Sequence, residues 1–348
     1  MHGEYKVPGG KLVVVDVAIE DSLLTRVSIS GDFFLEPDSA LEAMNVALVG
    51  MPVAADADEL ARAVSDAVGG ATLVGFSPQA IGIAVRRALG RATSWQDHTF
   101  DVIGPVVLDP VMHMALDEVI PHEVAAGRRR PVLRFWDWDN SLVVIGSFQS
   151  VRNEVDAQAA EREGIRVARR ISGGGAMFME PGNCITYSLV VPGSLVEGLS
   201  FVQSYAFLDD WVLGALSEVG VRARYVPLND IASDSGKLAG AAQRRFVDGT
   251  VLHHVTMAYD IDAGKMTRVL RIGREKLSDK GTVSAAKRVD PMRSQTGMSR
   301  EQLIDSFLKS FRSRYRTSES SYTADELAQA RELVRSKFCT PQWTYRIP

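Results

Sequence analysis

The spacing of apolar and polar residues predicts a first stretch of two strands followed by three helices. Residues 11–19 and 23–30 are rich in β-branched residues and alternate between apolar and polar, as strands do. The polar residues 20–22 between them are typical of a tight turn. Apolar residues then recur every three or four positions in three segments, which predicts helices at residues 38–48, 56–68 and 77–89.

The remaining chain mixes both periodicities. Helices are expected at residues 111–125, 155–163, 201–219, 300–315 and 323–337, and strands at 133–138, 142–146, 166–171, 185–191, 222–225, 237–245 and 250–259. Pro121 should kink or end the first of these helices, because proline lacks the amide proton that a helix interior needs. Asp139 and Asn140 should turn the first two strands into a hairpin.

Charge divides the chain into two modules. Residues 1–93 hold 7 Lys and Arg against 12 Asp and Glu, a net charge of −5, whereas the remainder carries +1. The polar stretch around residues 90–97 lacks periodicity. We therefore expect one module at residues 1–93 and a larger one at 94–348.

Composition narrows the class of protein. A hydrophobic fraction of 46% and a charged fraction of 24% are typical of globular proteins, and the net charge of −4 argues against a nucleic-acid partner. Two cysteines, Cys184 and Cys339, cannot build a disulfide framework. No apolar run approaches the roughly 20 residues of a membrane span, and no secretory signal is recognisable. A cytoplasmic enzyme with no membrane partner is expected.

The chemistry of the second module is concentrated first in residues 169–178, which read RRISGGGAMF. Glycines let the backbone approach a ligand closely, and successive N–H groups form a nest for an anion. The guanidinium of Arg170 has the planar geometry that suits phosphate or carboxylate. A glycine-rich turn after a basic strand is the purely structural alternative.

A second segment lies downstream, where Lys237 opens the small-residue strand KLAGAAQRR. Small neighbours such as Gly240 leave room for a ligand beside the lysine stem. A lysine there can neutralise a phosphate and a carboxylate as they react. Together the two segments resemble the lipoate-protein ligase family, within the wider biotin and lipoate ligase superfamily.

The resemblance covers about residues 94–348 and implies an α+β fold: a mixed, mostly antiparallel sheet flanked by helices, as in class II synthetases. Residues 9–11 and 31–37 resemble the small α+β accessory domain of these ligases, which would here precede the catalytic domain. A permuted order is physically tolerable if the two modules dock through the same surface.

The resemblance also assigns site residues. ATP and the adenylate are expected at Arg170, Ser172, Gly173, Gly174, Gly175, Ala176, Met177, Phe178 and Lys237, and in a basic loop at Lys280, Gly281 and Val283. Lipoate is expected at Lys237, Gly174 and Gly240. Lys237 is the expected catalytic residue. Met179 and Glu180 replace the histidine and aspartate that often follow this glycine motif, which leaves the substrate choice open.

Two polar pairs have more than one interpretation. Asp230 resembles the aspartate of the family's asparagine–aspartate pair and is a candidate Mg²⁺ ligand, since Mg²⁺ prefers hard oxygen donors; an Asx turn is the alternative. His253 and His254 are adjacent on a predicted strand, so their side chains should point to opposite faces and cannot readily share one metal.

The implied activity is ATP-dependent, with Mg²⁺ and lipoic acid. Lipoate would be activated to lipoyl-AMP and transferred to a lysine of a carrier domain, either of a 2-oxoacid dehydrogenase complex or of the glycine-cleavage carrier protein. Three alternatives remain: an octanoyl or lipoyl transferase that uses Cys184 instead of ATP, a biotin ligase, and a regulator whose acidic first module binds DNA.

Overall fold

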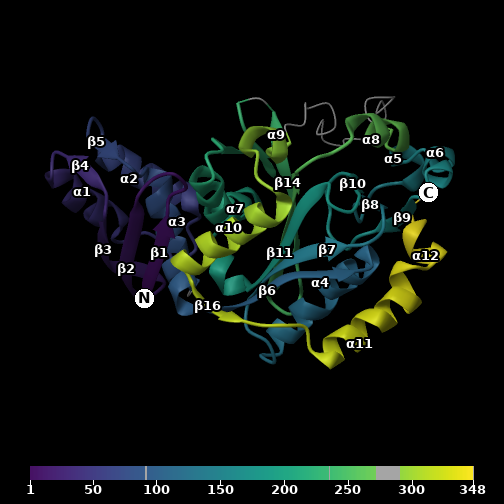
Figure 1. The fold of residues 1–348 in the computed structure, drawn as a ribbon. Coiled ribbons are helices and arrows are strands. Elements are labelled where there is room, and N and C mark those ends of the chain that lie inside the picture. The colour runs from purple at the N-terminus through teal and green to yellow at the C-terminus, as the bar shows by residue number, and fades with distance from the viewer. Residues whose placement is uncertain (91, 235, 272–290, 348) are drawn as a thin grey trace. The chain divides into compact units, whose positions relative to one another are not determined.

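The computed structural model describes residues 1–90, 92–234, 236–271 and 291–347, which form two compact units (Figure 1). The first unit contains Met1–Asp97 together with Gly193–Asp210, and the second contains His98–Pro192 and the chain from Trp211 onward. Residues 193–210 had been expected with the second module. The predicted boundary near residue 93 therefore does not describe the whole division, because the chain returns once to the first unit.

The first unit is built on a three-stranded antiparallel sheet in the order β1-β2-β3. Asp21 and Ser22 both have positive φ angles, 48° and 63°, which is the backbone of a type I′ hairpin turn. The predicted tight turn is confirmed. The unit contains β1 (His2–Lys6), β2 (Leu12–Glu20), β3 (Leu23–Gly31), β4 (Phe34–Glu36), β5 (Thr72–Val74), α1 (Ser39–Leu48), α2 (Ala57–Ala67), α3 (Pro78–Leu89) and the short 3₁₀ turns at Trp95–Asp97 and Gly193–Val196.

Capping residues fix where these helices begin. Asp56 and Glu59 form a capping box at the start of α2, and Ser77 accepts the Ala80 amide at the start of α3. Helix α3 packs against α2 and against β1 and β2. The three predicted helices are thus confirmed to within one or two residues.

Arg87 ties Gly193–Asp210 into the first unit. Its guanidinium is 1% exposed and donates to the carbonyl oxygens of Glu4, Thr93, Leu195 and Glu197 at 2.5, 2.7, 3.0 and 3.0 Å. Burial lowers the pKa of Arg87 to about 10, so the side chain stays charged at neutral pH. A single buried cation therefore joins three separate stretches of chain.

An eight-stranded mixed sheet forms the centre of the second unit, in the order β12-β13-β14-β15-β11-β7-β6-β16. Only the β6–β7 and β16–β6 pairs are parallel. Its strands are β6 (Thr99–Leu108), β7 (Val132–Trp138), β11 (Cys184–Pro192), β12 (Arg224–Val226), β13 (Asp230–Ala232), β14 (Lys237–Arg245), β15 (Thr250–Ala258) and β16 (Arg316–Glu319). The mixed sheet flanked by helices confirms the predicted fold class.

Helices cover both faces of this sheet, as neighbouring residues of β11 show. Tyr187 packs edge-on against Trp211, which in turn contacts Phe311 of α10 (Arg300–Arg314). Ser188 points to the opposite face and donates a hydrogen bond to Asp117 of α4 (Pro110–Ala125). Successive side chains on a strand alternate, so the two faces of β11 belong to two different layers of helices.

A smaller sheet carries β10 (Met177–Met179), β8 (Leu142–Ile145) and β9 (Arg166–Arg169), in that order. The predicted hairpin of residues 133–146 is wrong, because β7 lies in the large sheet and β8 in the small one. A type I′ turn needs positive φ at both central residues, and neither Asp139 nor Asn140 has it. Instead β8 pairs in parallel with β9 after a helical crossover.

The helices predicted at residues 111–125, 155–163, 300–315 and 323–337 are found to within a few residues, and the first of them runs through Pro121 to its predicted end at Ala125. The short helices at residues 151–154, 263–269, 292–296 and 341–344 were not predicted. The helices are α4 (Pro110–Ala125), α5 (Val151–Glu154), α6 (Ala157–Arg162), α8 (Ala263–Val269), α9 (Met292–Thr296), α10 (Arg300–Arg314), α11 (Ala324–Leu333), a π-helical turn at Val334–Phe338 and α12 (Pro341–Thr344). Helix α7 (Phe201–Glu218) begins in the first unit and ends in the second.

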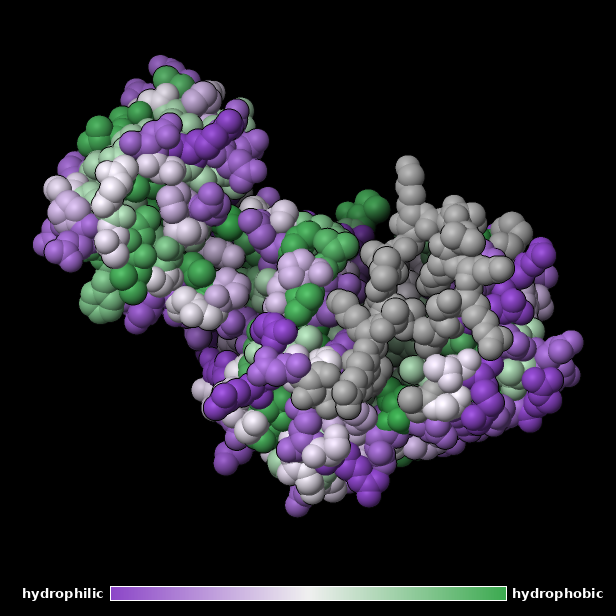
Figure 2. All heavy atoms as spheres, turned by 90° about the horizontal axis from the view of Figure 1, so that it is seen from above, coloured by the Kyte–Doolittle hydropathy of each residue, from purple (hydrophilic) through white to green (hydrophobic). Residues whose placement is uncertain are grey.

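Hydrophilic and hydrophobic residues lie side by side on the face seen in Figure 2. The most exposed large apolar side chains include Phe34 of the first unit and Phe148 and Val247 of the second. Within the described ranges, no helix is both long enough and apolar enough to cross a bilayer.

Candidate functional site

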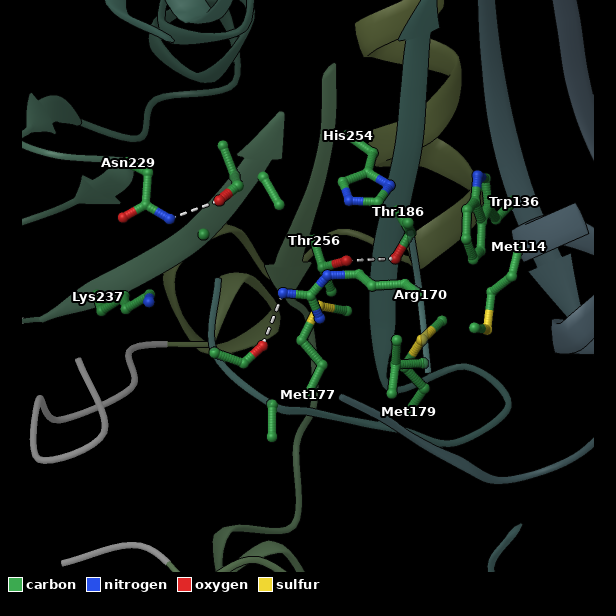
Figure 3. Close-up of a pocket in the computed structure, with 16 residues that line it drawn as sticks. Met114, Trp136, Arg170, Met177, Met179, Thr186, Asn229, Lys237, His254 and Thr256 are labelled. Atoms are coloured by element: carbon green, nitrogen blue, oxygen red, sulfur yellow. Dashed lines mark hydrogen bonds between the residues drawn. The ribbon is translucent and has the colours of Figure 1, made fainter. Parts of the chain in front are cut away.

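A pocket in the second unit gathers residues from strands of both of its sheets (Figure 3). It encloses about 630 Å³, including the part open to solvent. Lys237 and Asn229 lie on one side of it, and Trp136 and Met114 on the other. The lining residues are Met114, Trp136, Val144, Arg170, Gly175, Ala176, Met177, Met179, Thr186, Asn229, Lys237, Gly240, Ala241, Ala242, His254 and Thr256.

The two predicted motifs meet at this pocket. Of the predicted residues, Arg170, Gly175, Ala176, Met177, Lys237 and Gly240 line it. Ser172, Gly173, Gly174, Phe178 and Asp230 do not line it. Of these, Ser172 and Gly173 accept hydrogen bonds from Arg170, and Asp230 pairs with Lys237. The predicted adenylate-loop residues Lys280, Gly281 and Val283 lie outside the described residues.

A β-bulge aims Lys237 into the pocket. Ile231 pairs with Ala239, whereas the next residue, Ala232, pairs with Lys237. Strand β14 therefore advances by two residues where β13 advances by one, and Leu238 is the extra residue. The extra residue rotates the strand, and Lys237 then shares a face with Gly240, from which it would otherwise be turned away. A Cβ atom at Gly240 would lie 3.1 Å from Lys237 Nζ. The glycine therefore leaves the space that the ammonium group occupies.

Asp230 is the charge partner of Lys237. Its Oδ1 lies 2.8 Å from Lys237 Nζ, and the two side chains are 5% and 21% exposed. Among the described residues, no group of three or more His, Cys, Asp or Glu is arranged to hold a metal ion. Asp230, the candidate Mg²⁺ ligand, therefore has an ammonium group as a partner in this structure, and Mg²⁺ binding there stays a prediction.

Arg170 holds the glycine loop in shape. Its Nε donates to Ser172 Oγ and to the carbonyl of Gly173, both at 3.1 Å, and its Nη2 donates to the carbonyls of Gly173 and Gly175 at 2.6 and 2.9 Å. Gly174 has a φ of +90°, which a residue with a Cβ rarely adopts. The arginine and the glycines thus form one compact turn beside the pocket.

Arg169 fixes the base of the same loop from behind. It is fully buried and donates to the carbonyls of Gly146, Ser147 and Gln149 and to those of Trp343 and Thr344. Trp343 Nε1 donates back to the carbonyl of Arg169 at 2.8 Å. Residues near 344 are therefore part of the support of the glycine loop.

Sequence reasoning missed a buried network that reaches the pocket through His254. His254 Nδ1 is 2.7 Å from Asp117 Oδ2, and His254 Nε2 is 2.7 Å from Ser172 Oγ. Asp117 also accepts from Arg134 Nη2 at 2.5 Å and from Ser188 Oγ at 2.6 Å. One signal was available: Asp117 is an acidic residue in the middle of an apolar helix.

Electrostatics in this network follow from burial and pairing. Burial lowers the pKa of His254 below its usual range, against the opposing effect of Asp117. Burial disfavours the Asp117 carboxylate, but Arg134 and the hydrogen bond from His254 hold its pKa below the usual value. His113, which stacks on Trp136, has its pKa lowered to about 3 by burial and by Arg134. At neutral pH both imidazoles are therefore neutral, and that of His254 forms part of the pocket wall.

Neither cysteine lines the pocket. Cys184 is fully buried in β11, and burial raises the pKa of its thiol to about 12. Cys339 lies after the π-helical turn, and burial raises its pKa as well. A thiolate nucleophile at either position is disfavoured at neutral pH.

The adjacent histidines occupy different surroundings. His254 lines the pocket, whereas His253 is fully buried and does not line it. Of the two unusual residues after the glycine motif, Met179 lines the pocket and Glu180 pairs with Lys265 of α8.

Comparisons with known proteins agree with this arrangement. A model of the lipoyl protein ligase A/B catalytic domain matches residues 109–312. Octanoyltransferase LipM of Brevibacillus brevis is 26% identical over 267 residues, which cover 69% of this chain and 96% of that protein. It is therefore similar to this chain over almost its whole length.

Two solved structures from Thermoplasma acidophilum share the fold. A bi-partite lipoate protein ligase, determined with its E2 lipoyl domain, has a TM-score of 0.62 at 27% identity and covers 71% of this chain and 97% of its own. A structure with bound lipoic acid has a TM-score of 0.60 at 25% identity and covers 71% of this chain and 99% of its own.

Proposed function

This chain belongs to the family of the lipoyl protein ligase A/B catalytic domain, and from that membership we propose that it is an ATP-dependent lipoate-protein ligase. In the first step the carboxylate of lipoate attacks the α-phosphorus of ATP, which gives lipoyl-AMP and releases pyrophosphate. In the second step a lysine ε-amine of a carrier domain attacks the mixed anhydride. This forms an amide and releases AMP.

The polarity of the pocket supports this substrate. Lys237 lies on one side of the pocket, and Trp136 and Met114 lie on the other (Figure 3). A carboxylate that becomes an acyl phosphate needs a cation, whereas an eight-carbon tail with a disulfide ring needs apolar and polarisable walls. Lipoic acid bound to the related T. acidophilum chain is in accord with this assignment.

The position of the cysteines is the observation that favours a ligase over a transferase. A transferase that moves an acyl group from a thioester needs a nucleophile, and the sequence offered Cys184 for that role. Cys184 is fully buried outside the pocket, with its pKa raised to about 12. Activation by ATP needs no covalent nucleophile, only positioning and stabilisation of charge.

In this reaction Lys237 would stabilise the negative charge that develops on the α-phosphate and carboxylate oxygens. The bulge in β14 holds it in place, and Asp230 fixes its ammonium group. The glycine loop would present backbone N–H groups to the nucleotide from the other side. The enzyme thus contributes prearranged charge and geometry, which are the main sources of catalysis in acyl activation.

The alternative function is an ATP-independent octanoyl or lipoyl transferase, because the related LipM of B. brevis is named an octanoyltransferase. The two functions differ in what they require. Only the ligase incorporates pyrophosphate into ATP in a lipoate-dependent way, and only the transferase accepts an acyl group from a carrier thioester without ATP.

The deciding experiment is therefore lipoate-dependent ATP–pyrophosphate exchange, with biotin as the control acid. Exchange with lipoate and none with biotin supports the proposal. No exchange, combined with transfer of a labelled octanoyl group from an acyl-carrier protein to a lipoyl domain, would replace the proposal with the transferase.

We also propose that the first unit is the accessory domain of this ligase and serves the activation step. The related archaeal ligase is described as bi-partite. Removal of residues 1–93 should impair pyrophosphate exchange more than transfer from preformed lipoyl-AMP. Equal loss of both steps would instead mean that the unit only stabilises the fold, for example through Arg87.

The proposed protein partner is a lipoyl carrier domain of a 2-oxoacid dehydrogenase complex, or the carrier protein of glycine cleavage. The related archaeal structure was determined with an E2 lipoyl domain. Mass spectrometry of each carrier domain after incubation with enzyme, ATP and lipoate would show which of them gains a lipoyl group.

A further inference from the structure

A continuous chain of hydrogen bonds runs from the interior of α4 to the glycine loop. Asp117 Oδ2 lies 2.7 Å from His254 Nδ1, His254 Nε2 lies 2.7 Å from Ser172 Oγ, and Ser172 Oγ lies 3.1 Å from Arg170 Nε. The residues come from α4, β15 and the loop after β9. They therefore meet only in the folded unit.

The donors and acceptors favour a single direction along this chain. The Asp117 carboxylate can only accept, so His254 donates to it from Nδ1. The other nitrogen of a neutral imidazole, Nε2, then accepts the proton of Ser172 Oγ, which itself accepts from Arg170 Nε. This is the neutral imidazole that its burial favours.

Asp117 is fixed independently of His254. Arg134 Nη2 and Ser188 Oγ both donate to its Oδ1, and Trp136 Nε1 donates to Ser188 Oγ at 2.8 Å. The carboxylate and the guanidinium of Arg134 are at most 2% exposed. Asp117 thus has one oxygen held by the scaffold and the other free to orient His254.

The other charged or titratable groups near His254 do not change this picture. Arg170 and His253 both act to lower the pKa of His254, and Asp117 acts to raise it. Arg134 is paired with Asp117 on the side away from His254 Nδ1. The chain is therefore charge-balanced, and the imidazole stays neutral.

Arg170 and His254 line the pocket, whereas Asp117 and Ser172 do not. We infer that Asp117 is a positioning residue of the activation step: through His254 and Ser172 it fixes the guanidinium of Arg170 beside the bound nucleotide. This inference rests on the proposed ligase function for its activity readout. It adds residues on α4 and β15 to a site that the sequence motifs placed on the glycine loop and β14.

The variant Asp117→Asn tests this chain of hydrogen bonds because it keeps the size of the side chain and replaces one carboxylate oxygen, an acceptor, with an NH₂ group, a donor. If the amide oxygen of the asparagine accepts from Arg134 and Ser188, its NH₂ group faces His254 Nδ1. Two donors cannot share that contact, so the imidazole must move its proton to Nε2. Ser172 Oγ must then accept from both His254 Nε2 and Arg170 Nε and turn its own proton elsewhere, which disturbs one of the hydrogen bonds that hold Arg170.

The first experiment is a double-mutant cycle on lipoate-dependent pyrophosphate exchange. Asp117→Asn and Ser172→Ala should each lower kcat/KM by about 10²-fold, the size expected when a catalytic group is displaced by about 1 Å. If Asp117 acts through Ser172, the double variant should lose no more than either single variant. Asp305→Asn, an exposed aspartate on α10, is the matched control and should change nothing.

A loss in the double variant equal to the product of the two single losses would overturn the inference, because Asp117 would then act by another route. Activity of Asp117→Asn within threefold of wild type would overturn it as well. Should Asp117→Asn fail to fold, His254→Gln combined with Ser172→Ala completes the same cycle at the next link of the chain.

The second experiment does not depend on activity. Long-range ¹H–¹⁵N spectra of the imidazoles report which nitrogen carries the proton, and the His254 signals are identified by their loss in His254→Gln. Wild type should show the proton on Nδ1, and Asp117→Asn should show it on Nε2. The same tautomer of His254 in wild type and in Asp117→Asn would refute the proposed chain of hydrogen bonds. If wild type shows the expected tautomer but no exchange, the proposed function fails while the hydrogen-bond chain remains supported.

Discussion

Replacement of Lys237 by methionine should lower pyrophosphate exchange by about four orders of magnitude. An anionic oxygen about 3 Å from Lys237 Nζ gains about 5.5 kcal/mol at an effective dielectric constant of about 20. Asp230 lies 2.8 Å from the same Nζ on the other side, so it repels that oxygen from about 6 Å by about 2.8 kcal/mol. Methionine removes the attraction and leaves the repulsion. The loss of about 5.5 kcal/mol corresponds to about 10⁴-fold in kcat/KM.

The geometry makes a second, less expected prediction for the double variant Lys237→Met/Asp230→Asn. With both charges removed, the net loss against wild type falls to about 2.8 kcal/mol, or about 10²-fold. The double variant should therefore be about 100 times more active than Lys237→Met. It should also recover most of the stability that the single variant loses when the buried Asp230 carboxylate is deprived of Lys237, about 2 kcal/mol.

Both effects are measurable on the same samples. Steady-state pyrophosphate exchange gives kcat/KM, and urea denaturation gives the free energy of unfolding. Lys309→Met, which changes an exposed lysine on α10, serves as the matched control. The reasoning is wrong if Lys237→Met keeps more than a tenth of wild-type activity, or if adding Asp230→Asn does not raise the activity of Lys237→Met.

The other predictions concern groups away from Lys237. Cys184→Ala should leave pyrophosphate exchange within twofold of wild type and lower the free energy of unfolding by about 1 kcal/mol, because it deletes one buried sulfur. Loss of activity would mean that Cys184 takes part in the reaction. Arg87→Ala should lower the free energy of unfolding by about 3 kcal/mol, since it removes the hydrogen-bond donor of four carbonyl groups. A melting temperature equal to that of wild type would contradict this. Folding lowers the pKa of His113 from its ordinary value of 6.5 to about 3. Between pH 6.5 and 5 the unfolded chain therefore binds a proton at His113 and the folded chain does not, so the free energy of unfolding falls as the pH falls. His113→Asn should reduce that slope by up to about 1.4 kcal/mol per pH unit in urea titrations, and an unchanged slope would refute the assignment.

Local signals in the sequence predicted the elements better than their pairing. The alternation on either side of Asp21 and Ser22 led to a real hairpin, because both residues adopt the positive φ that the turn requires. Asp139 and Asn140 look similar in sequence and do not adopt it, so β7 and β8 part into different sheets. Turn-forming residues permit a hairpin, but the competing pairing of β8 with β9 decided the outcome.

The same limit applies to the site. The glycine loop and Lys237 could be found from sequence because each is a compact motif whose chemistry is evident within a few residues. The contacts among residues 117, 172 and 254 could not, because they join three elements that are far apart along the chain. The bulge that turns Lys237 toward Gly240 was also hidden, since it depends on how β14 pairs with β13.

The buried guanidinium of Arg169 has a consequence for how the chain is made. Its hydrogen bonds join the glycine loop to residues 343 and 344, about 175 positions later. Synthesis proceeds at roughly 5–20 residues per second, so residues 343 and 344 are added on the order of ten seconds or more after the glycine loop. Until then the donors on Nε and Nη2 that bond to residues 343 and 344 must be satisfied by water. The glycine loop therefore gains its full set of supporting hydrogen bonds only after residues 343 and 344 have been synthesised.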